Sequence, residues 1–261
     1  MSNGNNNIDT SEEQASLQQI EFDLGGYTSN RHNSRTLIIV PVLSGAYAIN
    51  HFLQVRAQWG VVSCNQKSNT SSTRTANLGN PFLSFIWSPE IFTGITSQIS
   101  AGFTIPIAHL PNNASTRNER DAYAFASALK GLKSMWLWSP DRFAFAVPLT
   151  LQWRASLFAI INLDTSAAVM LPTKQSSNNR TDAIFEFGAE IKTQSPLSLG
   201  FRIQTVTIIT LPTDRLQLSV SSFLEHEREF VTARIELSMP VGDPLAVFNY
   251  WFANLTTTFR F

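Results

Sequence analysis

Apolar and polar side chains alternate with a period of two along most of this chain. The alternation is cleanest between Val231 and Met239, where every second residue is apolar and the residues between them are Thr, Arg, Glu and Ser. It also continues from Trp251 to the last residue, Phe261, without fraying into a polar end. Successive side chains of a β-strand point to opposite faces, so each such segment predicts a strand with one apolar and one polar face.

Twelve segments of this kind predict an all-β fold. Their connections alternate between short turns and mostly longer loops, as in single-chain outer-membrane barrels, which have an even number of strands. Polar loops are predicted at residues 28–35 and 64–77, among others. The predicted strands are residues 16–27, 36–49, 51–63, 81–87, 91–108, 142–153, 156–171, 183–192, 197–211, 216–224, 231–239 and 249–261.

Charged residues make up only 15% of the chain, against roughly 25% in soluble domains. Lys, Asp and Glu are nearly absent from the apolar strand faces, so these faces suit lipid. Strands in lipid must close into a barrel, because no water is present to satisfy an open edge. About ten residues at about 3.4 Å each, tilted about 40°, span roughly 25 to 28 Å, which matches the apolar band of such barrels. The sequence therefore predicts a 12-stranded antiparallel transmembrane β-barrel over residues 16–261, with a short helical insertion in an extracellular loop.

Two other architectures fit part of this pattern. A soluble two-sheet β protein would turn the same apolar faces inward. The uncharged segment Thr36–Val55 is long enough for a spanning helix, but it contains Pro41 and Gly45 and is rich in β-branched residues. Residues 1–15 are polar and without pattern, which predicts a flexible leader, and no secretory signal is visible there.

The chain also resembles known bacterial outer-membrane β-barrels, whose last strand typically ends on Phe. On that resemblance, Trp251, Phe259 and Phe261 are expected to form the signal that the barrel-assembly machinery reads. Further segments resemble the outer-membrane transporter barrels grouped with phenol-degradation (meta-pathway) proteins, which carry Gly-Asp-Pro and Leu-Pro-Thr-Gly. Here Asn80 replaces the Asp, and the final Gly is missing after Thr173 and Thr213. The segments are Leu78–Pro81, Phe103–Pro106, Leu171–Thr173 and Leu211–Thr213.

This resemblance implies a location in the bacterial outer membrane, with outer-membrane lipid around the barrel. Such barrels place their short turns on the periplasmic side and their long loops outside. On that assignment the last strand descends, and the C-terminus at Phe261 is expected to be periplasmic.

Charged residues of both signs lie on the polar strand faces, which line the lumen if the apolar faces meet lipid. They either flank an aqueous path and set its selectivity, or pair across strands and seal the barrel. Twelve strands lie between the packed interior of eight and the open channel of sixteen, so both interpretations stay open. Charge reversal at Glu186 and Glu190 would distinguish them. The predicted lumen-lining residues are Arg56, Asp164, Glu186, Glu190, Arg202, Arg234, Glu236 and Arg260.

Residues 111–140 break the two-residue period. Asn118 is a suitable N-cap for a helix that begins at Glu119, and apolar residues then recur on one helical face at spacings of four, three and four. This face either folds into the barrel mouth as a constriction or plug, or packs over the rim or against a partner. The predicted constriction residues are Phe125, Leu129, Leu132 and Trp136.

Other classes of function have weak support. Nineteen basic and nineteen acidic residues balance, which argues against nucleic-acid binding. The four histidines lie in no recognisable nucleophile motif, and a single cysteine excludes an internal disulfide. We therefore predict no catalytic residue, metal or cofactor. The predicted function is a passive channel or transporter for small-molecule solutes, and the alternative is a non-conducting barrel that serves as a structural or docking subunit of a larger cell-envelope complex.

Overall fold

The structure is a computed structural model that describes residues 18–31, 34–68, 72–92, 94–110, 116–130, 132–156, 158–174, 180–209, 216–241 and 251–261. The predicted flexible leader, residues 1–15, lies outside these described residues. The strand segments, in chain order, are β1 (Gln18–Arg31), β2 (Ser34–Ala48), β3 (Leu53–Ser68), β4 (Ser72–Leu78), β5 (Phe82–Trp87), β6 (Glu90–Phe92), β7 (Ile95–Thr104), β8 (Arg142–Arg154), β9 (Ala159–Pro172), β10 (Asp182–Thr193), β11 (Leu197–Ile208), β12 (Leu216–Glu227), β13 (Val231–Pro240) and β14 (Phe252–Arg260).

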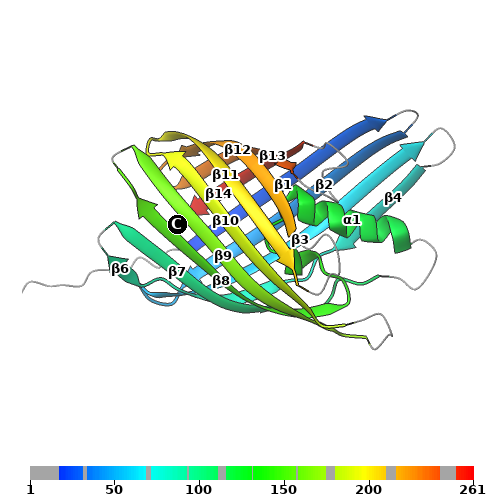
Figure 1. The fold of residues 1–261 in the computed structure, drawn as a ribbon, viewed down its shortest axis with the longest axis horizontal. Helices are drawn as coiled ribbons and strands as arrows, with labels where there is room; N and C mark the ends of the chain where they lie inside the picture. The colour runs from blue at the N-terminus through cyan, green and yellow to red at the C-terminus, as the bar shows by residue number, and fades with distance from the viewer. Residues whose placement is uncertain are drawn as a thin grey trace, which may run out of the picture.

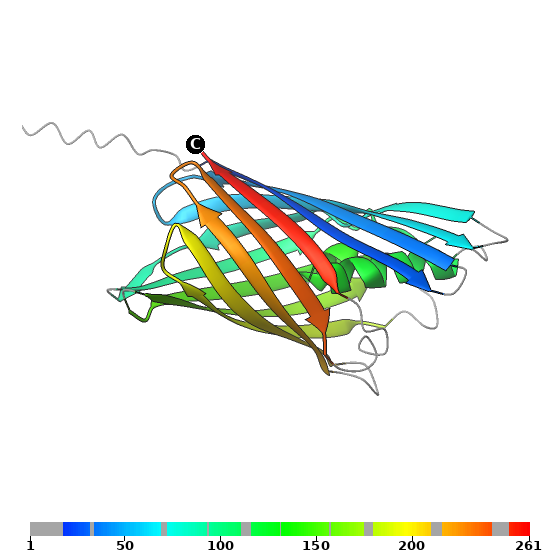
Figure 2. The same cartoon turned by 90° about the horizontal axis from the view of Figure 1, so that it is seen from above.

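One antiparallel sheet curls round until its first and last strands pair, which closes it into a barrel (Figures 1 and 2). β1 pairs with both β2 and β14, and β2 also pairs with β3. β4, β5 and β6 occupy one position in the wall, because β3 pairs with β4 and β5 while β7 pairs with β5 and β6. The fourteen segments therefore make twelve barrel strands. The predicted all-β, twelve-stranded antiparallel fold is confirmed.

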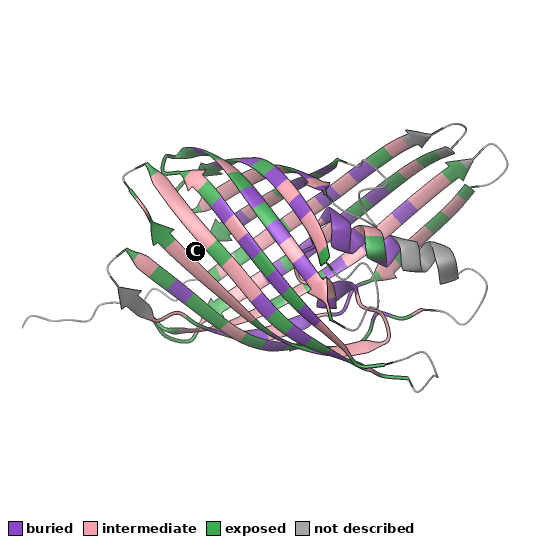
Figure 3. Cartoon of the chain, viewed as in Figure 1, coloured by how far each residue is buried: buried purple, intermediate pink, exposed green. Residues whose placement is uncertain are grey.

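The alternation along the strands gives the barrel an apolar exterior, and exposed and less exposed residues alternate along most strands (Figure 3). On β14, Leu255 and Phe259 lie outward and exposed, whereas Asn254 and Thr258 are buried in the interior. Ile20 of β1 lies opposite Phe259 and is also exposed, so the outer apolar band continues across the closing pair of strands. A two-sheet sandwich would bury these apolar side chains, and the structure contradicts that alternative.

The wall formed by β1 to β4 extends beyond the rest of the barrel at the end that carries the long connections (Figure 2). The prediction of polar loops at residues 28–35 and 64–77 is wrong for most of these residues. Their polar side chains stay in strands because pairing with the neighbour continues, with Ser34 opposite Ser68 and Lys67 opposite Ser72. Side chains of β4 are exposed or half-exposed on both faces, so no alternation in hydropathy marks this strand in the sequence.

The segment Thr36–Val55, considered above as a spanning helix, forms most of β2 and the start of β3. Within the described ranges, no helix is long and apolar enough to cross a membrane. Leu37 and Ile39 of β2 are exposed on the outer face, while Ile38 and Val40 are buried on the inner face. This strand is therefore apolar on both sides, and its inner side needs an apolar partner inside the barrel.

Prolines mark the ends of pairing on several strands. Pro172 and Pro240 are the last residues of β9 and β13, and Pro106 lies two residues beyond β7, while Pro212 falls outside the described residues. Pro41 and Pro148 lie within β2 and β8, and the ladder to one neighbour is interrupted beside each of them. A residue without an N–H cannot complete the ladder on both sides.

Helix α1 (Thr116–Leu129) and the short 3-10 helix η1 (Met135–Trp138) connect β7 to β8. α1 packs against β1 to β4 and β14, at the long-connection end of the barrel (Figures 1 and 2). The predicted helix is therefore present, but it begins before Glu119 and ends at Leu129 instead of continuing through Trp136. Leu132 and Ser134 have left-handed backbone conformations, with φ of 65° and 53°, which cannot continue a right-handed helix.

Candidate functional site

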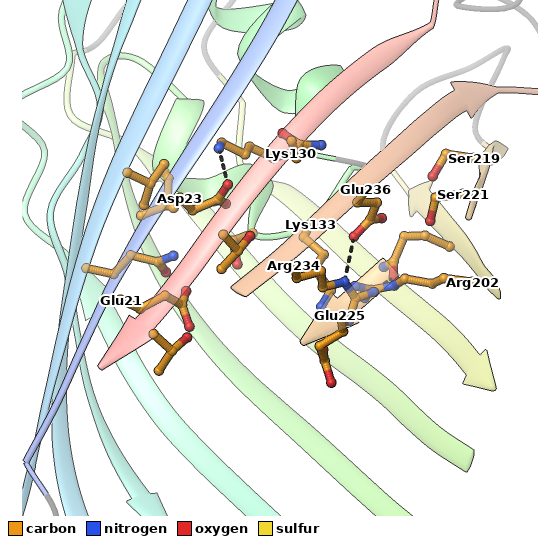
Figure 4. Close-up of a pocket in the computed structure, with 18 of the residues that line it drawn as sticks. Glu21, Asp23, Lys130, Lys133, Arg202, Ser219, Ser221, Glu225, Arg234 and Glu236 are labelled. Atoms are coloured by element: carbon orange, nitrogen blue, oxygen red, sulfur yellow. Dashed lines mark hydrogen bonds and ion pairs between the residues drawn. The ribbon is translucent and has the colours of Figure 1, made fainter. Parts of the chain in front are cut away.

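The insertion, defined as residues 111–140 and described for 116–130 and 132–140, crosses the barrel interior between two anchors. The first anchor is at the seam where β1 meets β14. Asn254 donates a hydrogen bond from Nδ2 to the Leu129 carbonyl at 2.7 Å, and Lys130 Nζ lies 2.9 Å from the Asp23 carboxylate (Figure 4). Burial lowers the pKa of the Lys130 amine below its usual range, and Asp23 offsets this only in part.

The second anchor lies on the opposite wall, on β9 and β10. The backbone N–H groups of Ser134 and Met135 donate to the Glu186 carboxylate at 3.3 and 3.2 Å, and the Ser166 hydroxyl donates to it at 2.9 Å. Glu186 is buried. The structure thus places this predicted lumen residue beneath the insertion, where it binds backbone N–H groups. Charge reversal at Glu186 would break an anchor as well as change the lining.

An apolar layer fills the interior at the level of the insertion. Trp138 lies against Gly60 and Gly79, where a Cβ would come within 2.5 and 3.0 Å of its ring. Trp136 packs on Phe82 with ring centroids 5.5 Å apart. The inner apolar residues of β2 and β3 complete the layer, which explains why β2 is apolar on both faces. Its other fully buried members include Ile38, Val40, Val62, Leu129, Leu132 and Val206.

Three of the four predicted constriction residues, Leu129, Leu132 and Trp136, are buried in this layer. Phe125 is half-buried and stacks on Tyr27 with centroids 6.2 Å apart. They meet inside the barrel although they do not share one helical face, because the chain turns after Leu129. Whether the layer restricts a path for solutes stays a prediction.

Asn80, in the break between β4 and β5, ties the insertion to the wall. Its side chain is fully buried. Its Nδ2 donates to the carbonyls of Ser139 at 2.7 Å and Trp136 at 3.4 Å, its Oδ1 accepts from the Ala108 N–H at 2.8 Å, and its backbone N–H donates to the Leu137 carbonyl at 2.7 Å. An amide is needed here because the site requires donors as well as an acceptor, which gives a structural reason for Asn rather than Asp at this position.

The two ends of the insertion meet at the rim. The Asp141 N–H donates to the Ala108 carbonyl at 2.8 Å, and the Leu110 N–H donates to the Asp141 carboxylate at 3.2 Å. Partial burial raises the pKa of Asp141, but hydrogen bonds from His109, Leu110 and Lys174 outweigh this and hold the pKa below its usual range. The insertion therefore leaves and re-enters the wall at one point, closed by an ionised carboxylate.

Replacing Asn80 with Asp is expected to loosen the insertion. The change removes the amide donors and places negative oxygen beside buried carbonyls, and each buried unsatisfied group costs about 1–3 kcal/mol. We expect trypsin to cleave after Lys130 and Lys133 about tenfold faster in N80D, since local opening exposes the bond. Asn162→Asp is the matched control, because Asn162 donates to Glu190 at 3.0 Å and is not bonded to the backbone of the insertion. Equal cleavage rates in N80D and the wild type would contradict the anchoring role.

Below the insertion, toward the short turns, ion pairs cover the inner surface of β9 to β13. Arg234 lies 2.7 Å from Glu190, 3.2 Å from Glu236 and 3.6 Å from Glu225. Its guanidinium covers the buried ring of Phe223 at 3.4 Å. One arginine thus neutralises carboxylates from three strands.

Glycines make room for this network. A Cβ at Gly200 would lie 2.1 Å from the Phe223 ring, and one at Gly188 would lie 2.4 Å from Gln204. Ion pairs can therefore join strands that are not direct neighbours: Arg202 of β11 to Asp164 of β9 at 3.2 Å, and Lys192 of β10 to Glu225 of β12 at 2.5 Å. We call this set the ion-pair belt. Its residues are Asp164, Glu190, Lys192, Arg202, Glu225, Arg234 and Glu236.

The structure places the eight predicted lumen residues in different settings. Asp164, Glu190, Arg202, Arg234 and Glu236 belong to the belt, and Glu186 anchors the insertion. Arg56 pairs with Glu21 on the β1–β3 wall at 3.3 Å, and Arg260 pairs with Glu227 at the short-turn rim at 3.3 Å. Sequence reasoning missed six further charged residues. Four of them occupy the polar positions of alternating strands, and this alternation could have identified them: Glu21, Asp23, Lys192 and Glu225. The other two, Lys130 and Lys133, lie in the insertion, which has no two-residue period.

Three cavities of about 380, 280 and 170 Å³ occupy the interior around the belt and beneath the insertion. Lys133 lines all three. Its side chain is 44% exposed and its amine lies 3.7 Å from Asp164, a looser contact than the pairs within the belt. The insertion therefore presents a cation at the point where the cavities meet.

At the short-turn end, the last strand is paired to its final residue. The Phe261 N–H donates to the Gln18 carbonyl at 2.9 Å, and Trp251, Phe259 and Phe261 are exposed. Their role as an assembly signal stays a prediction. In the part of the chain that the structure describes, no group of three or more His, Cys, Asp or Glu side chains is placed to hold a metal ion.

Compared by sequence, the chain matches no known family and no curated protein. Compared by structure, it is similar to an outer-membrane channel from Pseudomonas putida F1, with a TM-score of 0.65 at 11% identity over 97% of this chain and 100% of that one. The NanC porin gives a TM-score of 0.55 at 8% identity over 92% of this chain and 100% of that one. The β domain of the Bordetella autotransporter Brka gives 0.52 at 7% identity over 94% of this chain and 100% of that one.

Identities this low establish the fold alone. The fold is that of a bacterial outer-membrane β-barrel, as the resemblance in the sequence implies. More narrowly, the structure is similar to those of outer-membrane channels and porins.

Proposed function

We propose that this protein is a passive channel for small solutes in the bacterial outer membrane. One observation carries the proposal: cavities with charged and polar linings meet at Lys133 inside a barrel whose outer face is apolar. Such an exterior suits lipid, and such an interior suits water and polar solutes. The similarity in fold to outer-membrane channels and porins supports the same conclusion.

In this proposal the short turns and Phe261 face the periplasm, and the insertion enters the barrel from outside, as in other barrels of this class. Outer-membrane lipid covers the exterior, and the barrel-assembly machinery recognises the strand that carries Trp251, Phe259 and Phe261. The protein acts without a cofactor and catalyses no reaction. The insertion is the constriction, since its apolar layer lies between the cavities and the long-connection end.

The test is the single-channel conductance of the purified protein in a planar bilayer. The proposal expects discrete, reproducible current steps in KCl. A heat-modifiable, inserted barrel without any steps would contradict it, because insertion would then be shown independently of conduction.

A second candidate is a sealed barrel that serves as a structural or docking subunit of an envelope complex. The apolar layer and the buried ion-pair belt favour it, since both reduce open space in the lumen. Absence of conductance in the wild type, together with steps after removal of the insertion, would support this candidate.

A further inference from the structure

The charged residues of the interior are unevenly distributed around the barrel. The belt occupies β9 to β13, and Arg56 pairs with Glu21 across β1 to β3. By contrast, the described inward-facing side chains of β5 and β7 are uncharged, and so are those of β8 between Arg142 and Arg154. One side of the lumen therefore offers amides and hydroxyls in place of ions.

Three glutamines, two on this side and one on the adjacent strand β3, project into the cavities. Gln58 of β3 and Gln98 of β7 line the cavity of about 170 Å³, and Gln98 and Gln152 of β8 line the cavity of about 280 Å³. None of their amide groups has a hydrogen-bond partner among the described residues, whereas neighbouring Thr150 is already bonded to Asp164 at 2.9 Å. Unpaired amides that face a cavity can bind a solute without breaking a bond within the protein.

The roof of the smaller cavity adds an aromatic surface. Trp136 lines this cavity and is buried. An indole supplies a broad apolar face. Charged residues also line these two cavities, but most of them are paired: Asp164, Glu190 and Arg234 with one another or with Arg202, and Arg56 with Glu21. Lys133, 3.7 Å from Asp164, is the cation with the loosest contact.

We propose that this uncharged side of the lumen is a binding site for a small neutral solute with several hydroxyl groups, such as a polyol or a monosaccharide. Each hydroxyl both donates and accepts, as each glutamine amide does. The two cavities, of about 170 and 280 Å³, are smaller than the roughly 300–1,000 Å³ of typical ligand pockets, which limits the solute to a small one. Conduction requires binding that is favourable but weak. The inference deepens the proposed channel function and rests on it for the route of the solute.

The test compares sorbitol with gluconate, which has a similar carbon chain but carries a carboxylate. Binding is measured by saturation-transfer NMR on the full chain in a detergent without hydroxyl groups. We expect sorbitol to bind at least about fivefold more tightly than gluconate, because the site offers more neutral partners than cations. Equal or tighter binding of gluconate, or no detectable binding of sorbitol, would overturn the proposal, because the uncharged groups would then not determine recognition. This comparison needs no variant.

Variants locate the site. Gln98→Leu combined with Gln152→Leu keeps side-chain size but removes two amides, and we expect it to weaken sorbitol binding about tenfold. Gln217→Leu is the matched control, because Gln217 lies on β12 and lines none of the three cavities. Unchanged binding in the double variant, or equal loss in the control, would overturn the assignment. Conductance in KCl, measured in parallel, separates the two proposals. Current steps without sorbitol binding would support the channel function and contradict the binding site. Sorbitol binding without current steps would support the binding site and contradict the channel function.

Discussion

Replacing residues 111–139 with a short glycine–serine linker is expected to raise the single-channel conductance by about fivefold or more, because a barrel of twelve strands without a plug approaches an open pore. The apolar layer would lose Leu129, Leu132, Trp136 and Trp138 in one step. A short linker suffices, since the Asp141 N–H lies 2.8 Å from the Ala108 carbonyl. Planar-bilayer recordings in KCl provide the measurement.

The control carries the same linker in place of residues 175–179, in another long connection. It alters the connection between β9 and β10 and leaves the insertion intact. If the two variants conduct alike, the insertion does not limit the current, and the layer serves only to pack the barrel. The variant without the insertion will also be less stable, because Ile38, Val40 and Val62 would face water. Heat modifiability on gels must therefore confirm that this variant remains folded.

Replacing Arg234 with Met is expected to destabilise the barrel by about 3–5 kcal/mol, the usual cost of removing one partner from a buried charged network. Glu190, Glu225 and Glu236 would lose the cation that they share. Those barrels that remain folded should become strongly cation-selective, because the interior gains uncompensated negative charge. Urea unfolding in lipid vesicles measures the stability, and the reversal potential in a KCl gradient measures the selectivity.

Arg56→Met is the matched control for this change. Arg56 also pairs inside the lumen, but its side chain is 36% exposed and Glu21 is 25% exposed. Such a pair contributes about 0–1 kcal/mol. A similar loss of stability in both variants would show that the belt is no more important than a solvated pair.

The sequence was sufficient to predict the strands and their outer faces, because lipid demands apolar residues at every second position. It did not reveal β4, whose mostly polar side chains are exposed on one face and half-exposed on the other and leave no alternation in hydropathy to detect. Among lumen residues, alternation predicts which side chains face inward but not which of them pair. Two pairs of the belt, Arg202–Asp164 and Lys192–Glu225, skip a strand over Gly188 and Gly200, and that geometry exists only once the strands are assembled side by side.

The sequence also did not predict how far the insertion enters the barrel. An apolar face with Phe125 and Leu129 fits a barrel mouth and a rim equally well. The signals that decide between them were present but separate: the inner apolar face of β2 at Ile38 and Val40, and the small residues Gly60 and Gly79 that accommodate Trp138. In the sequence, each of these residues fits its own strand or turn and indicates no contact with the insertion. Only the folded barrel brings them together.

The anchor at the seam has a consequence for the order of assembly. Leu129 binds the last strand through Asn254, and Lys130 binds the first through Asp23, so these contacts need both chain ends in place. During synthesis the insertion emerges more than a hundred residues before Asn254 does. It can therefore reach its final position only after the barrel has begun to close. Once there, it contacts both the first and the last strand and stabilises their pairing.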